Sequence, residues 1–416
     1  MGDDTVRPAP RPASSAGSVP LDREILDLPF YEPRHRARAL ALGQWCEDRA
    51  EFWEQARQET PDKAGRHILR VLGEAGWLAF LDQSAAGAPE SGGADPADGD
   101  FRSLCLAREA LAYTEDLADF AFSIQTLSAT PILRYGTEEQ RRRFLPAMAS
   151  GTLAGAFAVS EEQAGSDVAA LALRAERDGD EYVLNGHKAW IANGTIADLF
   201  VVIARTGEGP GPLGLTAFLV PADTPGLRVR EPLEVIAPRS FAHLAFEDCR
   251  LPAGSVLGRR GGGFVVAMDL LERFRMTVGA AAVGFARRAA DAAQGRARQR
   301  SIYGGLLFDL PTVKADLADM EVELNAASLL VARAAWELDR GSRGFAKHSS
   351  IAKLHATEAA QRIVDRCVQM FGAAGLVQGS LPERLYRQIR SLRVYEGTSE
   401  VQQSTIAGAL DARRAR

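Results

Sequence analysis

Two serines, a glycine and a tryptophan near the middle of the chain could hold a flat, phosphorylated ligand. Ser160 and Ser166 offer hydroxyl groups to pyrimidine carbonyls and phosphate oxygens, and Gly165 lets a ligand approach the backbone closely. Trp190 supplies a flat aromatic ring, although a tryptophan in a predicted strand is equally compatible with packing in the core. These residue types would suit a ligand that combines a flat ring with polar oxygens, but they do not identify it.

Charged residues in the last third of the chain are further candidates for chemistry. Arg300 is a fixed cation that can pair with a diphosphate, but an arginine at a helix end is more often solvated. Glu396 precedes a Gly-Thr pair that opens a predicted helix, so its pattern alone favours a carboxylate stabilised by the helix dipole. Glu272 lies earlier, directly before Arg273.

Two familiar motifs do not carry the function that their pattern suggests. Gly209, Gly211 and Gly214 satisfy GxGxxG, but prolines interleave and a predicted strand follows where a dinucleotide turn requires a helix. Ser350 and Lys353 form an SxxK pair, yet its companion motifs SDN and KTG are absent and the pair falls within a predicted helix. We therefore assign no chemistry to either motif.

The composition is that of a folded globular chain of two to three domains. Of its 416 residues 46% are apolar, which excludes long disorder. The chain has 49 basic and 54 acidic side chains, and without an excess of positive charge nucleic acid is an unfavourable partner. Apolar runs fall far short of the roughly 20 residues that a bilayer span needs. The six histidines and four cysteines are dispersed, so we expect no metal site and reduced cysteines. Without an apolar secretory segment at the start, we expect a cytoplasmic protein.

The hydrophobic pattern predicts an α+β protein with three regions. Residues 1–20 are rich in Pro, Ala, Ser and Arg and are predicted to be a disordered tail. Residues 21–152 have helical periodicity, interrupted at 87–99 by a Gly, Pro and Asp segment that we expect to be an exposed loop. Residues 153–262 alternate in short runs typical of a small β-barrel or sandwich. Residues 263–416 return to long helices and predict an α-helical bundle.

Within these regions the pattern predicts individual elements. The predicted strands cover 172–176, 181–185, 200–205, 215–220, 227–229 and 243–246, with a hairpin turn at 178–179. The predicted long helices of the last region cover 265–298, 312–341, 348–371 and 397–410. Small residues from Val278 to Ala286 (VGAAAVGFA) would let another helix or a second subunit approach the first of these helices closely.

Three separated blocks of sequence resemble the acyl-CoA dehydrogenase family. The blocks are AVSEEQAGSDVAA at 158–170 with GHKAWIANG at 186–194, RSIYG at 300–304 with LADM at 317–320, and QMFGAAG at 369–375 with ERLYRQIRSLRVYEGTSE at 383–400. The order of helical, β and helical regions also matches, so the resemblance covers nearly the whole chain after the tail. It implies an FAD-dependent flavoprotein oxidoreductase with an N-terminal helical domain, a middle β domain and a C-terminal four-helix bundle.

The resemblance assigns FAD contacts to the first block. Ser160 would bond the pyrimidine edge of the flavin, Ser166 would bond the diphosphate, and Trp190 would lie against the isoalloxazine ring. Ala192 departs from the family, which usually places Thr or Ser there with its hydroxyl at flavin N5. A lost donor at N5 would weaken the stabilisation of the reduced, negatively charged flavin.

The other two blocks would bind the FAD of a neighbouring subunit, which implies a homodimer or homotetramer. The residues concerned are Arg300, Tyr303 in place of the more usual Phe, Gln369, Gly372, and Ala373 in place of a customary Gly. By the same resemblance, Thr398 is a further cofactor contact.

The resemblance also implies a base, because the family removes the α-proton of an acyl thioester while the β-hydrogen leaves as hydride to flavin N5. Glu396 matches the commonest position of the base, and Glu272 with Arg273 resembles branches that place it on an earlier helix before an arginine. A carboxylate suits this task where burial raises its pKa. We predict Glu396 as the base and Glu272 as the runner-up; with both present, one is paired with an arginine or the two share a proton.

Substrate contacts follow from the same resemblance. The thioester oxygen would be bound by the backbone N–H of Glu396 and a ribityl hydroxyl of the cofactor, with Arg273, Tyr395 and Gly397 as neighbours of the substrate. The substrate would be an acyl-CoA or, because loop 87–99 and the shortened segment near Arg239 border the family's acyl and pantetheine sites, an acyl-carrier-protein thioester. An electron-transferring flavoprotein is the expected electron acceptor.

Two alternative functions remain compatible with the sequence. Ala192 and the irregular segment at 236–246 favour a flavin oxidase or monooxygenase on the same fold, in which reduced flavin meets oxygen. The second alternative is a non-catalytic paralogue that has lost its flavin. For the dehydrogenase itself, the sequence does not determine which acyl group is the substrate.

Overall fold

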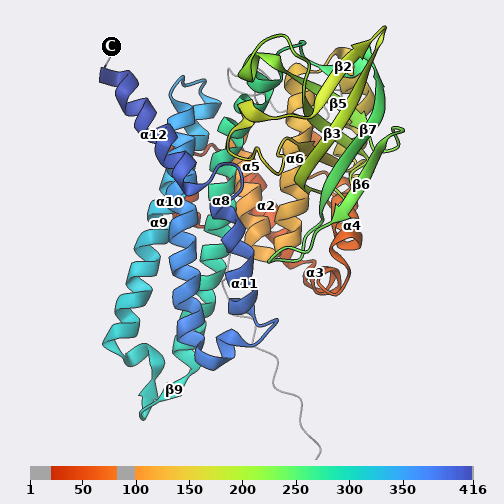
Figure 1. The fold of residues 1–416 in the computed structure, drawn as a ribbon. Helices are drawn as coiled ribbons and strands as arrows, with labels where there is room; N and C mark the ends of the chain where they lie inside the picture. The colour runs from red at the N-terminus through yellow and green to blue at the C-terminus, as the bar shows by residue number, and fades with distance from the viewer. Residues whose placement is uncertain (1–19, 82–98, 415–416) are drawn as a thin grey trace, which may run out of the picture.

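The computed structural model describes residues 20–81 and 99–414 and shows a helical region, a β-sheet region and a second helical region in chain order (Figure 1). The predicted tail lies outside the described residues except for Pro20, which is buried, and the predicted loop at 87–99 lies outside them except for Gly99. The predicted α+β fold class is confirmed, and all four cysteines are buried and unpaired.

The N-terminal region consists of short and medium helices around one long, buried helix. These helices are α1 (Arg23–Leu26), α2 (Pro33–Glu47), α3 (Ala50–Ala56), α4 (Pro61–Glu74), α5 (Phe101–Thr114), α6 (Asp116–Tyr135) and α7 (Glu138–Ala149). Helix α6 is buried on nearly all sides because apolar and small residues surround its axis. The amide of Gln125 on α6 accepts from the backbone N–H of Gly155 at 2.9 Å and so joins this helix to the first strand.

The middle region is one eight-stranded sheet with the order β6-β7-β3-β2-β4-β5-β8, and β1 lies parallel to β4. Its strands are β1 (Gly155–Ala158), β2 (Arg174–Asp178), β3 (Glu181–Ala192), β4 (Leu199–Arg205), β5 (Leu215–Pro221), β6 (Leu227–Pro232), β7 (Phe241–Pro252) and β8 (Val256–Leu257). The predicted hairpin joins β2 to β3, with Gly179 at φ 60° in the turn. Within the described residues the path ends at β6 and β8 without closing into a barrel.

The C-terminal region is a bundle of long helices that lies beside α5 and α6 (Figure 1). Its elements are α8 (Gly263–Gln299), a hairpin of β9 (Ser301–Ile302) and β10 (Gly305–Leu306), α9 (Pro311–Asp339), α10 (Phe345–Phe371), α11 (Leu381–Arg390) and α12 (Ser399–Arg414). Helix α11 is amphipathic and begins with a proline in its first turn, but the sequence analysis did not predict it as an element.

Glycines on α8 let two other helices pack closely, as the small residues of this helix predicted. A Cβ atom on Gly284 would lie 2.2 Å from the carbonyl oxygen of Glu109 on α5. A Cβ atom on Gly279 would lie 3.2 Å from the carbonyl oxygen of Ala352 on α10. The first distance is shorter than any allowed contact, so only glycine permits this approach of α5 and α8.

We expect Gly284→Ala to destabilise the protein by about 1–3 kcal/mol, because the new methyl group overlaps the backbone of α5. Gly295→Ala on the same helix is the matched control, since a Cβ atom there meets no atom within 4 Å. That change should stabilise the helix by about 0.5–1 kcal/mol. Denaturant-induced unfolding measures both, and an equal effect of the two substitutions would contradict the packing argument.

Candidate active site

Glu396 lies in a sharp turn between α11 and α12. Its backbone has φ 53° and that of Gly397 has φ 88°, so two successive residues adopt left-handed conformations. The side-chain amide of Gln402, on the first turns of α12, donates to the carbonyl oxygens of Glu396 at 3.2 Å and Gly397 at 2.9 Å. The ammonium group of Lys353 on α10 donates to the same Gly397 oxygen at 2.7 Å. The turn is therefore held from two helices.

The side chain of Glu396 points into the protein without a hydrogen-bond partner for one of its oxygens. Its Oε2 is buried and, among the described residues, accepts no hydrogen bond. Burial raises the pKa of this carboxyl, against the opposing effect of the cations Arg108, Lys353 and Arg275. A buried carboxylate with a raised pKa and a free lone pair is equipped to accept a proton from a ligand.

Two buried Arg–Asp pairs lie beside Glu396 and the preceding Tyr395. Arg108 on α5 binds both carboxylate oxygens of Asp119 on α6 at 2.8 Å. Its remaining nitrogen donates to the hydroxyl of Thr277 on α8 at 2.9 Å. These bonds fix the position of the cation that acts most strongly on the pKa of Glu396.

The second pair joins the segment between β6 and β7 to the helical regions. Arg239 binds both carboxylate oxygens of Asp116 at the start of α6, with its Nε at 3.1 Å from Oδ2. It also donates to the hydroxyl of Ser391, just after α11, at 3.0 Å. Burial raises the pKa of Tyr395 to about 12, so this phenol stays protonated beside the two arginines at neutral pH.

Glu272 lies in a different electrostatic environment. Burial raises the pKa of this carboxyl too, while Arg275 and Arg273 lower it and Asp269 raises it further. Arg273 donates to Asp269 at 2.8 Å and stacks 5.5 Å from the ring of Phe345. Of the cations that act on the pKa of Glu396, Arg275 also acts on that of Glu272.

The predicted flavin segment is held by a buried ion pair. The ammonium of Lys188 on β3 lies 2.8 Å from Oε1 of Glu161 and donates to the carbonyl oxygen of Val159 at 2.7 Å. The Glu161 carboxylate also accepts the backbone N–H of Ala172 at 2.7 Å. This pair fixes the chain that follows β1 against β3, where the backbone N–H of Ala189 donates to the carbonyl oxygen of Ser160 at 2.9 Å.

Trp190 projects from an irregularity in β3. The register between β3 and β7 shifts between Lys188 and Ile191, and Trp190 itself has φ 55°. Its side chain is 50% exposed and meets the ring of His243 edge-on at 5.9 Å. A strained conformation that exposes a large aromatic ring is typical of a functional position. The ring is therefore available for stacking, which decides against core packing for this residue.

The other predicted residues of the flavin segment are half-buried or exposed. Ser160 is half-buried after β1, Ser166 is exposed in the following loop, and Ala192 is half-buried at the end of β3. Next to Ala192, the backbone N–H of Asn193 donates to the carbonyl oxygen of Ser240 at 2.8 Å. Since the neighbouring Arg239 binds Ser391, this short path of contacts joins β3 to the turn of Glu396.

The residues predicted to contact a partner's cofactor gather at the other end of the bundle. Arg300 ends α8, and Tyr303 is 93% exposed in the hairpin of β9 and β10. The exposed residues Gln369, Gly372 and Ala373 lie where α10 ends. Arg296 stacks 5.5 Å from the ring of Phe371, which brings the ends of α8 and α10 together. Thr398 and Gly397 lie instead beside Glu396.

His35, Asp100 and Asp339 form a cluster whose potential metal-ligating atoms all lie within 4.8 Å of one another. These atoms already have hydrogen-bond donors: the backbone N–H of Phe101 donates to Asp339 at 2.9 Å and that of Ser103 to Asp100 at 3.0 Å. The cluster therefore caps the start of α5 and ties it to the end of α9. We assign it a structural role.

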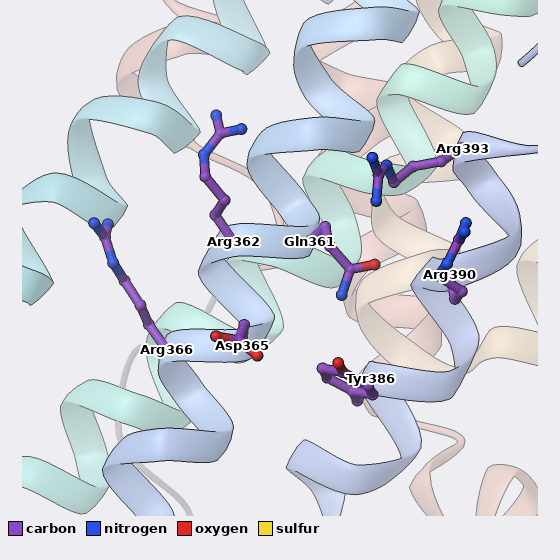
Figure 2. A pocket seen from close by; sticks show the side chains of 7 residues that line it. All are labelled: Gln361, Arg362, Asp365, Arg366, Tyr386, Arg390 and Arg393. Carbon is purple, nitrogen blue, oxygen red and sulfur yellow. The ribbon is translucent and has the colours of Figure 1, made fainter. Parts of the chain in front are cut away.

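An open pocket of about 400 Å³ lies against α10, α11 and the following turn, as Figure 2 shows. It is lined by Gln361, Arg362, Asp365, Arg366, Tyr386, Arg390 and Arg393. Arg362 and Arg366 bind carboxylates of α9 at 2.7 and 3.1 Å. Arg393 binds Glu358 on α10 at 2.8 Å. Most of the positive charge is thus neutralised, and we assign no ligand to this pocket.

Several residues of the site were not predicted from sequence. They are Arg108, Asp116, Asp119, Glu161, Lys188, Arg239, Lys353 and Gln402. Charged residues within an otherwise apolar helix, such as Arg108, were a usable signal, because burial of a charge requires a partner. The SxxK pair was a second signal, since its lysine contacts the turn of Glu396.

The fold thus presents a buried carboxylate with a raised pKa and an exposed aromatic ring, joined by a short path of contacts. Family models of the N-terminal, middle and C-terminal domains of acyl-CoA dehydrogenases match residues 33–152, 156–249 and 261–410. The chain belongs to the acyl-CoA dehydrogenase family. It is therefore an oxidoreductase of a flavoprotein family, as predicted.

Individual relatives agree with this membership. The chain is 42% identical over 282 residues to the human mitochondrial short-chain specific acyl-CoA dehydrogenase. This match covers 67% of this chain and 68% of the human protein. The structure of butyryl-CoA dehydrogenase from Megasphaera elsdenii has 30% identity and a TM-score of 0.81, covering 91% of this chain and 98% of that one. The prolyl acyl carrier protein oxidase AnaB has 27% identity and a TM-score of 0.80, covering 91% and 99%.

In the described part of the chain, none of the helices combines the length and apolar character that crossing a bilayer requires.

We expect Lys188→Met to destabilise the protein by about 3–5 kcal/mol, because it leaves the buried carboxylate of Glu161 without its cation. Arg228→Met is the control, since it breaks an exposed pair with Glu247 in the same sheet and should leave stability unchanged. Thermal and denaturant unfolding of both variants measure the difference. Equal stability of Lys188→Met and the wild type would show that the pair does not hold this segment.

Proposed function

We propose that the protein is an FAD-dependent acyl-thioester dehydrogenase in which Glu396 removes the α-proton of the substrate. The observation that carries this proposal is the buried Oε2 of Glu396, which accepts no hydrogen bond in the described part of the chain. Burial raises the pKa of this carboxyl and so makes it a stronger base than an exposed glutamate. Glu272 remains the alternative base.

We propose the cofactor contacts of the family for the residues around β3. The exposed ring of Trp190, with Ser160 nearby through Ala189, fits a flat cofactor with a pyrimidine edge. Ser166 is exposed and free to bind the diphosphate, with Thr398 as a further contact. When bound, the flavin supplies the acceptor for the β-hydrogen as hydride. Ala192 offers only its backbone at the position where the family has a hydroxyl.

The turn of Glu396 also supplies an electrophilic contact in this proposal. The backbone N–H of Glu396 would bind the thioester oxygen together with a ribityl hydroxyl, which stabilises the charge that develops as the α-proton leaves. Tyr395 and Gly397 flank the base and would contact the acyl group. Arg273 would shape the wall of the site through its contacts with Asp269 and Phe345.

A second copy of the chain would complete the cofactor site. Arg300, Tyr303, Gln369, Gly372 and Ala373 gather at one end of the bundle, while Trp190 and Glu396 lie at contacts between the sheet and the helices. The exposure of the first group is what a role toward a partner's FAD requires. We therefore propose a homodimer or homotetramer.

Anaerobic titration with acyl-CoA and acyl-carrier thioesters tests the function. We expect at least one thioester to bleach the flavin absorbance of the wild type. Glu396→Gln should retain its yellow colour but reduce the bleaching rate by about 10²–10⁴-fold, because the amide cannot accept the proton.

Glu272→Gln is the matched comparison and should bleach at nearly the wild-type rate. The reverse result would assign the base to Glu272, and a wild type that is bleached by no thioester would remove this substrate class. A colourless purified protein would support the flavin-free alternative.

A flavin oxidase is the second candidate, favoured by the absence of a hydroxyl at Ala192 and by the similarity to the prolyl carrier-protein oxidase. In the dehydrogenase the electrons would pass to an electron-transferring flavoprotein. We expect the reduced protein to react slowly with oxygen in stopped-flow measurements and Ala192→Thr to leave this slow rate unchanged. Rapid reoxidation by oxygen, slowed by Ala192→Thr, would establish the oxidase instead.

A further inference from the structure

Lys353 is a fully buried lysine that the proposed reaction does not yet use. Its side chain has 0% exposure, and its ammonium donates to the carbonyl oxygen of Gly397 at 2.7 Å. A buried ammonium is unfavourable without compensation, and methionine would fill the same volume without that cost. Burial accordingly lowers the pKa of Lys353 to about 8. The contact with Gly397 and the nearby carboxylates offset its burial; of these carboxylates Glu396 acts most strongly, followed by Glu358 and Glu400.

Lys353 contacts the turn of Glu396 and Gly397, whose backbone conformation is unfavourable unless neighbouring residues hold it. Glu396 and Gly397 have φ 53° and 88°, and a non-glycine residue such as Glu396 rarely adopts a left-handed conformation unless its surroundings impose it. Lys353 and Gln402 both donate to the carbonyl oxygen of Gly397, one from α10 and the other from α12. These two donors fix the peptide plane that follows Gly397, and the bond from Gln402 to the Glu396 carbonyl oxygen at 3.2 Å fixes the plane that follows Glu396. Together the three bonds set the backbone, and therefore the direction of the Glu396 side chain.

The other residue of the SxxK pair supports the same region. The hydroxyl of Ser350, one turn before Lys353, accepts from Arg275 at 3.3 Å. Arg275 is a second cation that acts on the pKa of Glu396. One face of α10 thus presents both a direct donor to the turn and a hydroxyl that anchors a neighbouring cation.

We propose that Lys353 is a positioning residue that holds the turn of Glu396 and directs its carboxylate toward the substrate α-carbon. This inference rests on the proposed role of Glu396 as the base. Lys353 itself does not contact the reacting atoms. It acts through the Gly397 carbonyl and through its positive charge.

The charge gives Lys353 an effect that a purely structural contact lacks. The charged groups that act on Glu396 are Arg108 from α5, Asp119 from α6, Arg275 from α8 and Lys353 from α10. Arg108 is neutralised by its bidentate pair with Asp119, whereas Lys353 donates to a neutral carbonyl. Loss of the Lys353 charge should therefore raise the pKa of Glu396 and delay ionisation of the base to higher pH.

The test compares Lys353→Met, Lys353→Arg and Lys347→Met, the last a partly exposed lysine on the same helix. With a thioester that bleaches the wild type, we expect Lys353→Met to lower kcat by about 100-fold, as a small misplacement of a catalytic group does, with little change in KM. The acidic limb of its kcat profile should move to higher pH. Lys353→Arg should return the limb toward its wild-type position, and Lys347→Met should match the wild type.

Lys353→Met should still fold, because Gln402 continues to bond the Gly397 oxygen and methionine fills the volume. Hydrogen exchange of the peptide that contains Glu396 and Gly397 provides a readout besides activity, and should be faster in this variant. An unchanged acidic limb and unchanged exchange in folded Lys353→Met would overturn the proposal. Glu396→Gln in the same series separates this outcome from failure of the proposed function, because that variant alone tests the base.

Discussion

The site depends on keeping one carboxylate basic inside the protein while cations surround it. Burial raises the pKa of Glu396, but Arg108, Lys353 and Arg275 each oppose that effect. Three unpaired cations at this position would make the carboxylate too acidic to remove a proton from carbon. The structure limits their effect through Asp119, whose two oxygens bind Arg108 at 2.8 Å. The neighbouring aspartate is thus as important to the proposed base as the arginine that it neutralises.

This constraint explains why the three regions meet where they do. Asp119 and Asp116 both lie in the first turn of α6, the long helix that also contacts the sheet through Gln125. Asp119 binds the arginine from α5, and Asp116 binds Arg239 from the segment between two strands. The start of α6 is therefore the point at which the sheet and both helical regions share buried charges. Movement of this helix would disturb both the surroundings of Glu396 and the path to β3.

The sequence was sufficient for the fold class and for the residues that lie in short motifs. Trp190 and Glu396 were found because each belongs to a contiguous block that resembles one family, and the positions of most strands followed from alternation. The pairings around them were not predictable in this way. Lys353 and Gly397 are 44 positions apart, and Arg239 and Ser391 are 152 apart. Periodicity reports which side of an element is buried, but it carries no information about which distant residue faces it.

The missed helix α11 and the open sheet have similar causes. Helix α11 is short and rich in charged residues, and although its buried Leu385 and Ile389 lie at helical spacing, ten residues offer few such positions to separate a helix from a loop. The alternating strands of the middle region are compatible with an open or a closed sheet. The sheet closes only if the end strands β6 and β8 can pair with each other, and the local sequences of these strands do not specify whether they do.

The two residues that carry the proposed chemistry share one structural solution. Trp190 and Glu396 both have left-handed backbones, with φ 55° and 53°, and each has a buried lysine that donates to a backbone carbonyl nearby. Lys188 is also paired with Glu161, so its charge is neutralised within the segment that it holds. Lys353 donates to a neutral carbonyl, and its charge acts on the pKa of Glu396. A buried lysine thus holds the backbone in both places, and in the proposed function Lys353 also controls the ionisation of Glu396.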